Sequence, residues 1–384
     1  MSTTISLAAI CSFGLESLVA GELRRLGYTN LRVERGAVYW CAGVEAIARA
    51  NLWLRCADRV LVVLGSFEAT TFDELFEGVR ALPWADWLPE DAEFPVSGKS
   101  VASQLASVPA CQSVTKKAIV EALGHQYGRQ HFEETGPRFR IQLALRKNRA
   151  TLTLDTSGSG LHRRGYRDLA APAPLRETLA AAMVLLSHWQ PDFILADPCC
   201  GSGTLVIEAG LIGRNIAPGS LRTFDAFKWP CVGRKVWADA LEEADDLAQP
   251  QRPLRLWASD IDPAALQLAR HHAQRAGLQT EIEFAQRPVA QFATKHRYGY
   301  LLCNPPYGER LGDVQAAEQL YRELGQVYAR LRDWSLLALT PHEGFEALFG
   351  REATHRRRLY NGRIRCTLYQ YFGPRPPSSG SRDR

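Results

Sequence analysis

Long apolar runs are missing from this sequence of 384 residues. No stretch of about 18 uninterrupted apolar residues occurs, so no membrane-spanning helix is predicted. The amino terminus lacks the basic region of a secretory signal, and Ser12 and Glu16 interrupt its apolar residues. We therefore expect a cytoplasmic protein with no membrane partner.

Paired cysteine motifs are missing as well. The nine cysteines are scattered without Cys-x-x-Cys pairs, and Cys199 and Cys200 are adjacent. This pattern fits neither a disulfide framework nor a zinc site. His162, His271 and His272 have no metal-ligand spacing with carboxylates or thiols. We expect reduced thiols and no bound metal.

The overall amino-acid composition is ordinary for a globular protein. The chain is 46% hydrophobic and 23% charged, with 30 glycines and 21 prolines, which excludes a mostly disordered or fibrous chain. Its length corresponds to about two or three domains. The net charge of +5 does not by itself demand a polyanionic partner.

The pattern of helices and strands changes along the chain. Residues 1–155 read as mixed α+β segments, such as a helix at 14–26 and a strand at 138–145. A stretch rich in Gly, Ser, Pro and Arg follows. Beyond it, short apolar strands alternate with helices, which predicts a parallel, doubly wound sheet. A hairpin turn is predicted at Asn361-Gly362, and the last residues, PRPPSSGSRDR, read as disordered. The predicted apolar strands are 193–196, 255–258, 281–285, 300–303 and 335–339.

A glycine-rich turn follows the strand at 193–196. Asp197 opens the run DPCCGSGT, and a Gly-x-Gly turn between a strand and a helix lets the backbone approach a ligand closely. Val206 stands where a third glycine of a dinucleotide fingerprint would be, and the lysine of a Walker A loop is absent. Taken alone, a tight turn that merely needs glycine is an equal alternative.

Carboxylates end the next predicted strand. Asp260 and Asp262 lie in SDIDP, where a carboxylate can hold a ribose diol. The separation from Asp197 exceeds the roughly 20 residues of a dinucleotide fingerprint, so an insertion must lie between them. That insertion is aromatic and basic; core packing is the favoured interpretation and contact with nucleic acid the alternative. Its aromatic and basic residues include Phe224, Phe227, Trp229, Trp237, Arg222, Lys228, Arg234 and Lys235.

The tetrad Asn304-Pro305-Pro306-Tyr307 follows the apolar strand at 300–303. Two prolines end the strand and stiffen the loop. An asparagine oxygen and a neighbouring backbone carbonyl can together accept both hydrogens of an exocyclic amine, and a tyrosine can stack on a flipped base. The alternative is an ordinary rigid loop.

The order of these motifs resembles a known family. DPCCGSGT, SDIDP and NPPYGERLG are similar to the S-adenosylmethionine (SAM)-dependent methyltransferases of exocyclic amino groups. With GLHRRGYRD and APLRETLAAAM, nearly the whole chain resembles the THUMP-containing RNA guanine-N2 methyltransferases, in particular the bacterial 23S ribosomal RNA enzymes. Some relatives carry a second, fused methyltransferase; we expect none here.

The resemblance implies an α/β protein, with a Rossmann-like class I methyltransferase domain preceded by α+β ferredoxin-like and THUMP domains. The implied boundaries are a ferredoxin-like domain at 1–65, a THUMP RNA-binding domain at 66–155, a linker at 156–175, the methyltransferase domain at 176–373 and a disordered tail at 374–384.

The resemblance also implies site residues. SAM is the expected cofactor, and Asn304, Pro305, Pro306 and Tyr307 are expected to hold the target guanine. Relatives often carry an acidic residue that accepts the adenine amine, but Pro288 stands there, so Gln286 or backbone groups are expected to serve instead. The expected cofactor-binding residues are Asp197, Pro198, Cys200, Gly201, Ser202, Gly203, Thr204, Asp260, Ile261, Asp262 and Gln286.

Basic residues are concentrated in two stretches. One runs from Arg140 to Arg176, and residues 355–365 hold five arginines and no acid. Such local excess is the expected footprint for RNA phosphates, and solvated faces or salt bridges are the alternative. The RNA-binding residues predicted from the first stretch are Lys147, Arg163, Arg164 and Arg167.

The sequence therefore predicts a SAM-dependent methyltransferase that acts on a guanine N2 amine of 23S ribosomal RNA, naked or in an assembly intermediate, by direct transfer without a covalent enzyme intermediate. Alternatives are a transfer RNA guanine-N2 methyltransferase, a DNA adenine-N6 methyltransferase, and a non-catalytic RNA-binding or ribosome-assembly factor that keeps the fold. A nucleophilic role for Cys199 or Cys200 is disfavoured.

Overall fold

The computed structural model describes residues 4–169, 175–308 and 311–375. The chain forms two compact units. The first unit comprises Met1–Cys11, Val19–Leu161 and Arg222–Asp246, and the second comprises Ser12–Leu18, His162–Leu221 and Leu247–Arg384. The predicted tail lies, except for residues 374 and 375, outside the described residues, as does the 170–174 part of the predicted linker.

A single sheet of seven strands organises the first unit, in the order β2-β3-β1-β4-β7-β6-β5. Its central strand β4 pairs with β1 on one side and β7 on the other, and it runs across the predicted boundary at residues 65 and 66. The ferredoxin-like and THUMP parts therefore share one continuous sheet. The strands are β1 (Ile5–Cys11), β2 (Arg32–Glu34), β3 (Ala37–Ala42), β4 (Ala57–Glu68), β5 (Val96–Val101), β6 (Arg140–Arg146) and β7 (Arg149–Asp155).

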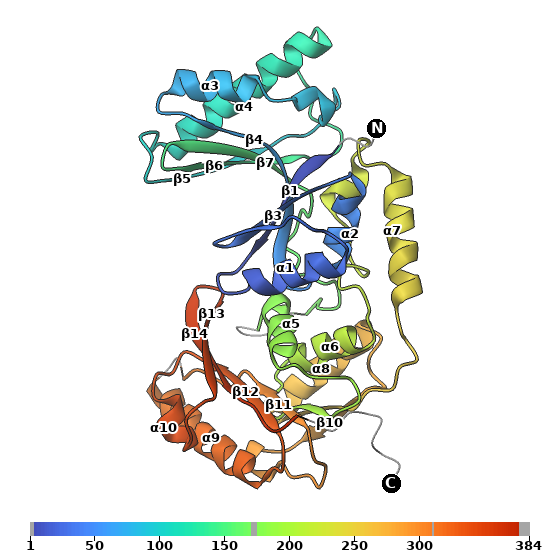
Figure 1. Ribbon diagram of the computed structural model, residues 1–384, viewed down its shortest axis with the longest axis vertical. Helices are drawn as coiled ribbons and strands as arrows, with labels where there is room; N and C mark the ends of the chain where they lie inside the picture. Colours follow the sequence, from blue (N-terminus) through green and yellow to red (C-terminus); the bar gives the residue numbers. More distant parts are fainter. Residues whose placement is uncertain (1–3, 170–174, 309–310, 376–384) are drawn as a thin grey trace. The chain divides into compact units, whose positions relative to one another are not determined.

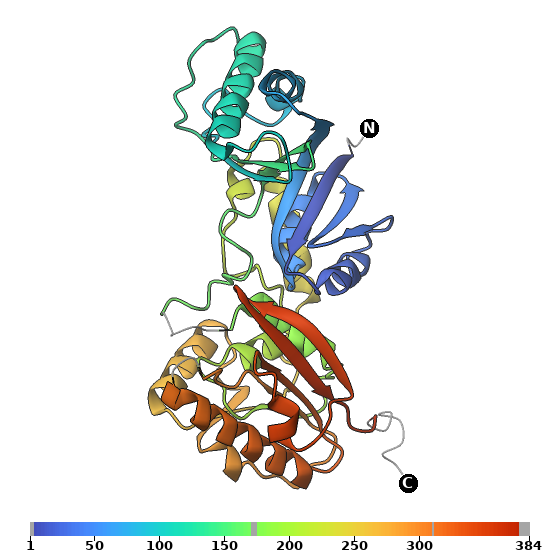
Figure 2. The same ribbon diagram turned by 90° about the vertical axis from the view of Figure 1, so that its left-hand side faces the viewer.

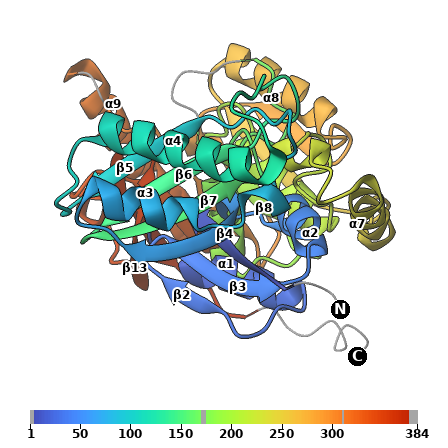
Figure 3. The ribbon, with the colours of Figure 1, turned by 90° about the horizontal axis from the view of Figure 1, so that it is seen from above.

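Helices α3 and α4 cover one face of the part of this sheet formed by β4, β7, β6 and β5. Helix α3 begins with a capping box, in which the Thr71 hydroxyl accepts from the Glu74 backbone N–H and the Glu74 carboxylate accepts from the Thr71 N–H. Figure 3 shows α3 and α4 side by side over these strands. The helices before the insertion are α1 (Glu16–Arg25), α2 (Glu45–Trp53), α3 (Phe72–Arg80), η1 (Trp84–Asp86) and α4 (Val108–Tyr127).

The aromatic insertion packs into the first unit. It contains η2 (Asp225–Lys228) and α7 (Arg234–Leu247). The Trp229 ring stacks on Phe139 with ring centroids 4.3 Å apart, and its indole N–H donates to the Arg138 carbonyl. This confirms the core-packing interpretation. Residues 222–246, which lie within the expected methyltransferase domain at 176–373, group with the first unit.

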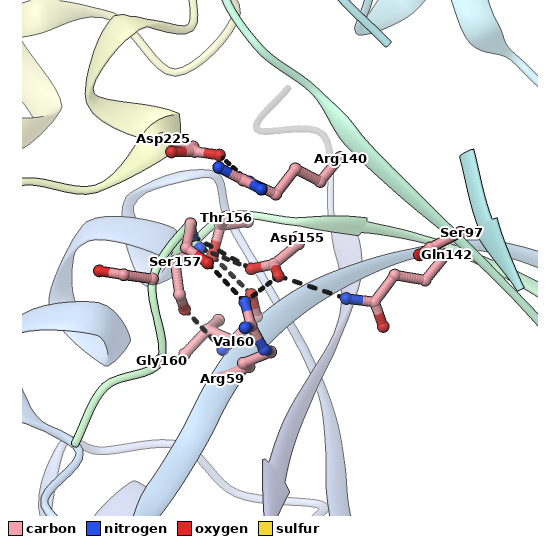
Figure 4. A network of polar contacts seen from close by, with 12 residues as sticks. Arg59, Val60, Ser97, Arg140, Gln142, Asp155, Thr156, Ser157, Gly160 and Asp225 are labelled. Carbon is pink, nitrogen blue, oxygen red and sulfur yellow. Dashed lines mark hydrogen bonds and ion pairs between the residues drawn. The ribbon is translucent and has the colours of Figure 1, made fainter. Parts of the chain in front are cut away.

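Asp155 is the centre of a buried polar network in the first unit (Figure 4). Its carboxylate accepts from the Arg59 guanidinium, from the Gln142 amide at 3.2 Å and from the Ser157 backbone N–H at 3.0 Å. Because Asp155 ends β7 and its partners Arg59 and Gln142 lie on β4 and β6, the network joins three neighbouring strands. A buried carboxylate is tolerated only when donors surround it in this way.

The second unit contains another seven-stranded sheet, in the order β10-β9-β8-β11-β12-β14-β13. The five neighbouring strands β10, β9, β8, β11 and β12 are parallel, and β14 pairs antiparallel with β12. This confirms the predicted parallel sheet and the hairpin at Asn361-Gly362. The strands are β8 (Leu195–Asp197), β9 (Leu256–Asp260), β10 (Ile282–Gln286), β11 (Tyr300–Cys303), β12 (Ser335–Thr340), β13 (His355–Asn361) and β14 (Ile364–Tyr371).

Helices cover both faces of this sheet, with α5, α6 and α8 on one side and α9 and α10 on the other (Figures 1 and 2). Strands buried on both faces explain why β11 and β12 read as unbroken apolar runs. None of the described helices could cross a membrane. The helices are α5 (Glu177–Leu186), α6 (Thr204–Gly213), α8 (Pro263–Arg275), η3 (Val289–Gln291), α9 (Leu311–Arg330) and α10 (Phe345–Phe349).

Replacing the buried carboxylate should destabilise the fold. We expect Asp155→Ala to lower the free energy of unfolding by about 3 kcal/mol, because the donors that face it lose their acceptor. Urea unfolding followed by circular dichroism measures the change. Glu77→Ala is the control, since it breaks only an exposed pair with Arg80, and exposed pairs contribute little to stability. An equal, small effect of both substitutions would contradict this role of Asp155.

Candidate active site

The ends of three parallel strands meet at one edge of the second sheet. Asp197 is the last residue of β8, Asp260 is the last residue of β9, and Asn304 directly follows β11. All three line a cavity of about 600 Å³. The other predicted site residues that line it are Pro198, Cys200, Gly201, Ser202, Thr204, Ile261, Asp262 and Pro306.

The glycine loop is held by close packing and by Asp260. Gly203 has φ +80° at the start of α6, and a Cβ there would lie 3.0 Å from the Ala269 Cβ of α8. Gly203 therefore allows the two helices to approach, and it does not line the cavity. The Gly201 N–H donates to the Asp260 carboxylate at 2.8 Å, which ties the loop to the end of β9.

The two acids of SDIDP have different local roles. The second Asp260 oxygen accepts from the Asp262 backbone N–H at 3.0 Å, so the orientation of the carboxylate is fixed. Each oxygen retains a lone pair for a ligand hydroxyl. Asp262 caps α8 by accepting from the Ala264 N–H at 2.9 Å, although it also lines the cavity.

The electrostatics of the cavity favour a cation. Its described lining contains four carboxylates and no lysine or arginine: Asp197, Asp260, Asp262 and Glu323. Asp197 is buried, and its side chain accepts one backbone N–H, from Cys199 at 3.2 Å. Burial first, and the neighbouring Asp260 charge second, raise the pKa of Asp197 well above its usual value. A positively charged ligand would relieve this cost, whereas a polyphosphate would be repelled.

The residues that line the expected adenine site differ from the prediction. Pro288 and the largely exposed Ile261 line the cavity and offer apolar contact for a flat ring. Gln286 does not line it; its side-chain amide donates to the Ile261 carbonyl at 3.2 Å. Gln286 thus steadies the end of β9 beside Ile261, and a direct contact through its side chain is not supported.

The loop after β11 is fixed by contacts that the sequence did not signal. The Tyr321 hydroxyl of α9 donates to the Pro306 carbonyl at 2.8 Å and lies 3.0 Å from the Thr340 hydroxyl. Pro305 is buried and lies outside the cavity lining, whereas Pro306 is exposed and lines it. Gly308 has φ +72°, and a Cβ there would lie 2.8 Å from the Val314 Cα, so glycine is required.

Tyr307 lies against the C-terminal hairpin and outside the cavity lining. Its hydroxyl donates to the Asn304 side-chain oxygen at 2.7 Å. The Asn361 amide and the Cys366 thiol donate to the same hydroxyl, at 3.2 and 3.6 Å. Burial raises the pKa of Tyr307, so the hydroxyl stays protonated and available as a donor. The sequence placed Asn361 only in a predicted hairpin turn, and no motif pointed to Cys366 or Tyr321, because the partners of all three are remote in sequence.

Neither cysteine of the glycine loop is poised as a nucleophile. The neighbouring Cys303 thiol and burial raise the pKa of Cys199, and burial beside Asp197 raises that of Cys200. A thiolate, not a thiol, is the reactive form, so both groups are inert at neutral pH. Within residues 4–169, 175–308 and 311–375, no group of three or more His, Cys, Asp or Glu is placed to hold a metal ion.

The predicted RNA-binding arginines divide into exposed and buried side chains. Arg164 is 2% exposed and forms an ion pair with the buried Glu208 at 3.3 Å, so its prediction as a phosphate ligand is wrong. Arg167 contacts the Thr204 hydroxyl and pairs with Glu177 at 3.4 Å, which makes it a support of the cofactor loop. Arg163 and Lys147 are exposed. The local sequence indicated that these side chains are charged, but it did not indicate which of them are buried.

Comparisons with known proteins agree with this geometry. A family model described as an RMKL-like methyltransferase domain matches residues 164–370. The chain belongs to the RMKL-like methyltransferase family. An RlmL ferredoxin-like domain model matches residues 6–61, and a THUMP domain model matches residues 69–155.

Full-length relatives of this RMKL-like methyltransferase are known. YpsC of Bacillus subtilis, assigned provisionally as an RNA methyltransferase, is 48% identical over 369 residues, 96% of each chain. The ribosomal RNA large subunit methyltransferase K/L of Methylococcus capsulatus is 35% identical and matches 98% of this chain, which spans 53% of that protein.

Two solved structures share the whole fold of this RMKL-like methyltransferase. A Listeria monocytogenes protein described as a predicted N6-adenine-specific DNA methylase is 51% identical, with a TM-score of 0.93 over 97% of each chain. SMU.472, provisionally a methyltransferase, is 43% identical, with a TM-score of 0.93 over 98% of this chain and 100% of its own, and was crystallised with S-adenosylhomocysteine (SAH). The cofactor is therefore SAM, and its cationic sulfonium and ammonium groups suit the acidic cavity.

The buried carboxyl should make cofactor affinity depend on pH. Because the pKa of Asp197 is raised, the free protein holds more of this group protonated, and a bound cation favours the ionised form. We therefore expect SAM to bind more tightly as pH rises through the titration of Asp197, with release of a proton. Calorimetry in buffers of different ionisation enthalpy measures both effects. Asp197→Asn should abolish both, and an unchanged pH dependence in that variant would assign the effect to another group.

Proposed function

We propose that this RMKL-like methyltransferase methylates the exocyclic N2 amine of a guanine in 23S ribosomal RNA. The observation that carries the proposal is the position of Asn304, which lines the cofactor cavity at the end of β11 on a loop stiffened by Pro305 and Pro306. The side-chain oxygen of Asn304 is an acceptor with two lone pairs, and an aromatic amine presents hydrogens that need acceptors.

The chain's part in the reaction is alignment. The Asn304 oxygen and the Pro305 carbonyl accept the two amine hydrogens, which directs the nitrogen lone pair toward the cavity. Bound SAM supplies an electrophilic methyl group on its sulfonium. The Tyr321 contact to the Pro306 carbonyl holds the loop in register with β12, so little motion is needed to align the amine.

Binding of RNA is supported by the THUMP domain and by a basic turn within it. Lys147 and Asn148 both have positive φ in the turn between β6 and β7, which holds the exposed Lys147 between Arg146 and Arg149, both also exposed. In the second unit Arg163 adds an exposed cation. We assign Lys147 and Arg163 to RNA phosphates, whose binding is dominated by charge.

A DNA adenine-N6 methyltransferase is the second candidate, because the Listeria relative carries that description. The same tetrad suits the N6 amine of adenine, so the active site does not separate the two substrates. The THUMP domain favours RNA. A transfer RNA target and a non-catalytic assembly factor are the remaining alternatives; an intact Asn304 beside an acidic cavity argues against the last.

Mapping the labelled nucleoside tests the proposal. The protein is incubated with methyl-labelled SAM and separated 23S, 16S and transfer RNAs and duplex DNA, and the products are digested and resolved. We expect N2-methylguanosine from 23S RNA, either naked or in assembly intermediates. Label in N6-methyladenine of DNA, or in transfer RNA alone, would overturn the assignment, and SAM binding without any transfer would favour the assembly factor.

Asn304 should be required for turnover but not for cofactor binding. We expect Asn304→Ala to lower kcat by about a hundredfold or more, because the amine loses its positioned acceptor. The Kd for SAM, measured by calorimetry, should change less than about threefold. Asn304→Asp keeps the shape and an acceptor, so it should retain more activity than the alanine variant. Near-normal turnover of Asn304→Ala would exclude the positioning role.

The basic turn should contribute to RNA affinity through charge. We expect Lys147→Glu with Arg149→Glu to weaken RNA binding and to reduce the slope of log K against log salt by about 1 for each phosphate that the protein no longer neutralises. Lys235→Glu, an exposed side chain of α7 that is paired with Asp239, is the control. An unchanged salt slope in the double variant would remove the turn from the RNA-binding surface.

A further inference from the structure

The hairpin β13–β14 extends past the catalytic edge of the second sheet. Strand β14 pairs antiparallel with β12 from Leu336↔Tyr371 to Thr340↔Thr367, which is the end of β12. Residues 361–366 therefore lie beyond the carboxyl ends of the parallel strands, on the side of Asn304. The long hairpin is visible in red in Figure 2.

One face of this hairpin holds Tyr307 through a directed series of hydrogen bonds. Asn361 and Cys366 share a face, because their cross-strand partners are Ile364 and Leu359. The Asn361 amide donates to the Tyr307 hydroxyl at 3.2 Å. The Cys366 thiol lies 3.6 Å from the same hydroxyl and 3.7 Å from the Ile364 carbonyl, and it donates to the hydroxyl when its proton points there. A phenol has a single proton, so a hydroxyl oxygen that accepts from both donors gives its own proton to the Asn304 oxygen, at 2.7 Å.

This series determines which end of the Asn304 amide faces which partner. A side-chain amide can rotate by about 180° and exchange its oxygen for its NH2 group with little change in shape. An NH2 group aimed at a substrate amine would repel it, since both are donors. The Tyr307 proton holds the Asn304 oxygen in place, and the second lone pair of that oxygen is left for the substrate.

The opposite face and the tip of the hairpin carry arginines. Arg358 lies opposite Thr367, and Arg365 lies opposite Tyr360, so both occupy the face away from Asn361. Arg363 is in the turn. All three are exposed, and within the described part of the chain they form no ion pair, unlike Arg356, which pairs with Glu346.

We propose that the β13–β14 hairpin couples substrate phosphates to the amine acceptor. Asn361 and Cys366 are positioning residues that act on Asn304 through Tyr307, while Arg363 and Arg365 bind backbone phosphates of the same RNA. The RNA as the source of the phosphates and the amine-acceptor role of Asn304 rest on the proposed function. The coupling through Tyr307 does not require that the amine be the N2 of a guanine, since it concerns any amine that Asn304 accepts.

A double-mutant cycle tests the coupling. Asn361→Leu and Tyr307→Phe should each lower kcat about five- to tenfold with little change in the KM for SAM. Because both act through one hydroxyl, the double variant should be no slower than Tyr307→Phe alone. If the loss of kcat in the double variant equals the product of the two single losses, the proposed coupling through the Tyr307 hydroxyl is overturned. Cys366→Ser, which keeps a donor, should retain more activity than Cys366→Val, and equal losses would exclude the thiol.

The phosphate contact is tested separately by binding. Arg363→Glu with Arg365→Glu should weaken 23S RNA binding more than tenfold and lower the salt slope, with the Kd for SAM unchanged. The matched control is Lys295→Glu with Arg332→Glu, two exposed cations that precede β11 and β12 at the opposite edge of the sheet. Equal effects of the two double substitutions on RNA binding, or a loss confined to duplex DNA binding, would overturn the assignment of Arg363 and Arg365 to RNA phosphates.

The two proposals fail in different ways. The kinetic cycle is measured on whichever nucleoside the wild-type protein methylates. A target other than guanine N2 therefore overturns the proposed function and leaves the coupling energy measurable, whereas additivity with the expected target overturns the coupling alone.

Discussion

The parallel pairing of β9, β8, β11 and β12 is the constraint on which the active site depends. Parallel strands end at one edge, so the residues that terminate them are brought together however far apart they lie in the sequence. Asp197, Asp260 and Asn304 are neighbours for this reason alone. The lack of a side chain at Gly203 allows α6 and α8 to approach closely behind the loop that follows Asp197.

Buried charge serves different purposes at two places in the second unit. Arg164 and Glu208 are both buried and neutralise each other, with the Tyr166 hydroxyl adding a third contact at 3.2 Å. That pair joins the segment after residue 161 to α6. Asp197 is buried beside another carboxylate, and it forms no ion pair with any residue that the structure describes. An uncompensated buried charge is costly, so its retention at the edge of a cavity is explained by a ligand that brings the opposite charge.

Local sequence patterns were enough to predict the parallel sheet, whereas most of the expected cofactor residues came from the family resemblance. The strand at 300–303 and the turn at Asn361-Gly362 were placed correctly because apolar runs and turn residues are local signals. The role of Arg164 was predicted wrongly, and the side chain of Gln286 does not line the cavity, since neither burial nor the direction of a side chain can be read from composition. Asn361 and Cys366 were missed because their contact with Tyr307 depends on the register of β12 with β14. Long-range register has no local signature.

The site must hold a cationic cofactor and a polyanionic substrate within a few residues of each other. Acidic side chains line the cavity, whereas exposed arginines lie at the tip of the hairpin and on its face away from Asn361. Between them stand neutral groups: Asn304, Tyr307, Asn361 and Cys366. Neutral donors and acceptors orient the Asn304 oxygen without adding charge. The negative potential that favours the sulfonium and the positive potential that favours the phosphates therefore remain in separate places. A charged residue in place of Tyr307 or Asn361 would bind one of the two ligands at the expense of the other, which explains why this connection is made of amide, phenol and thiol groups.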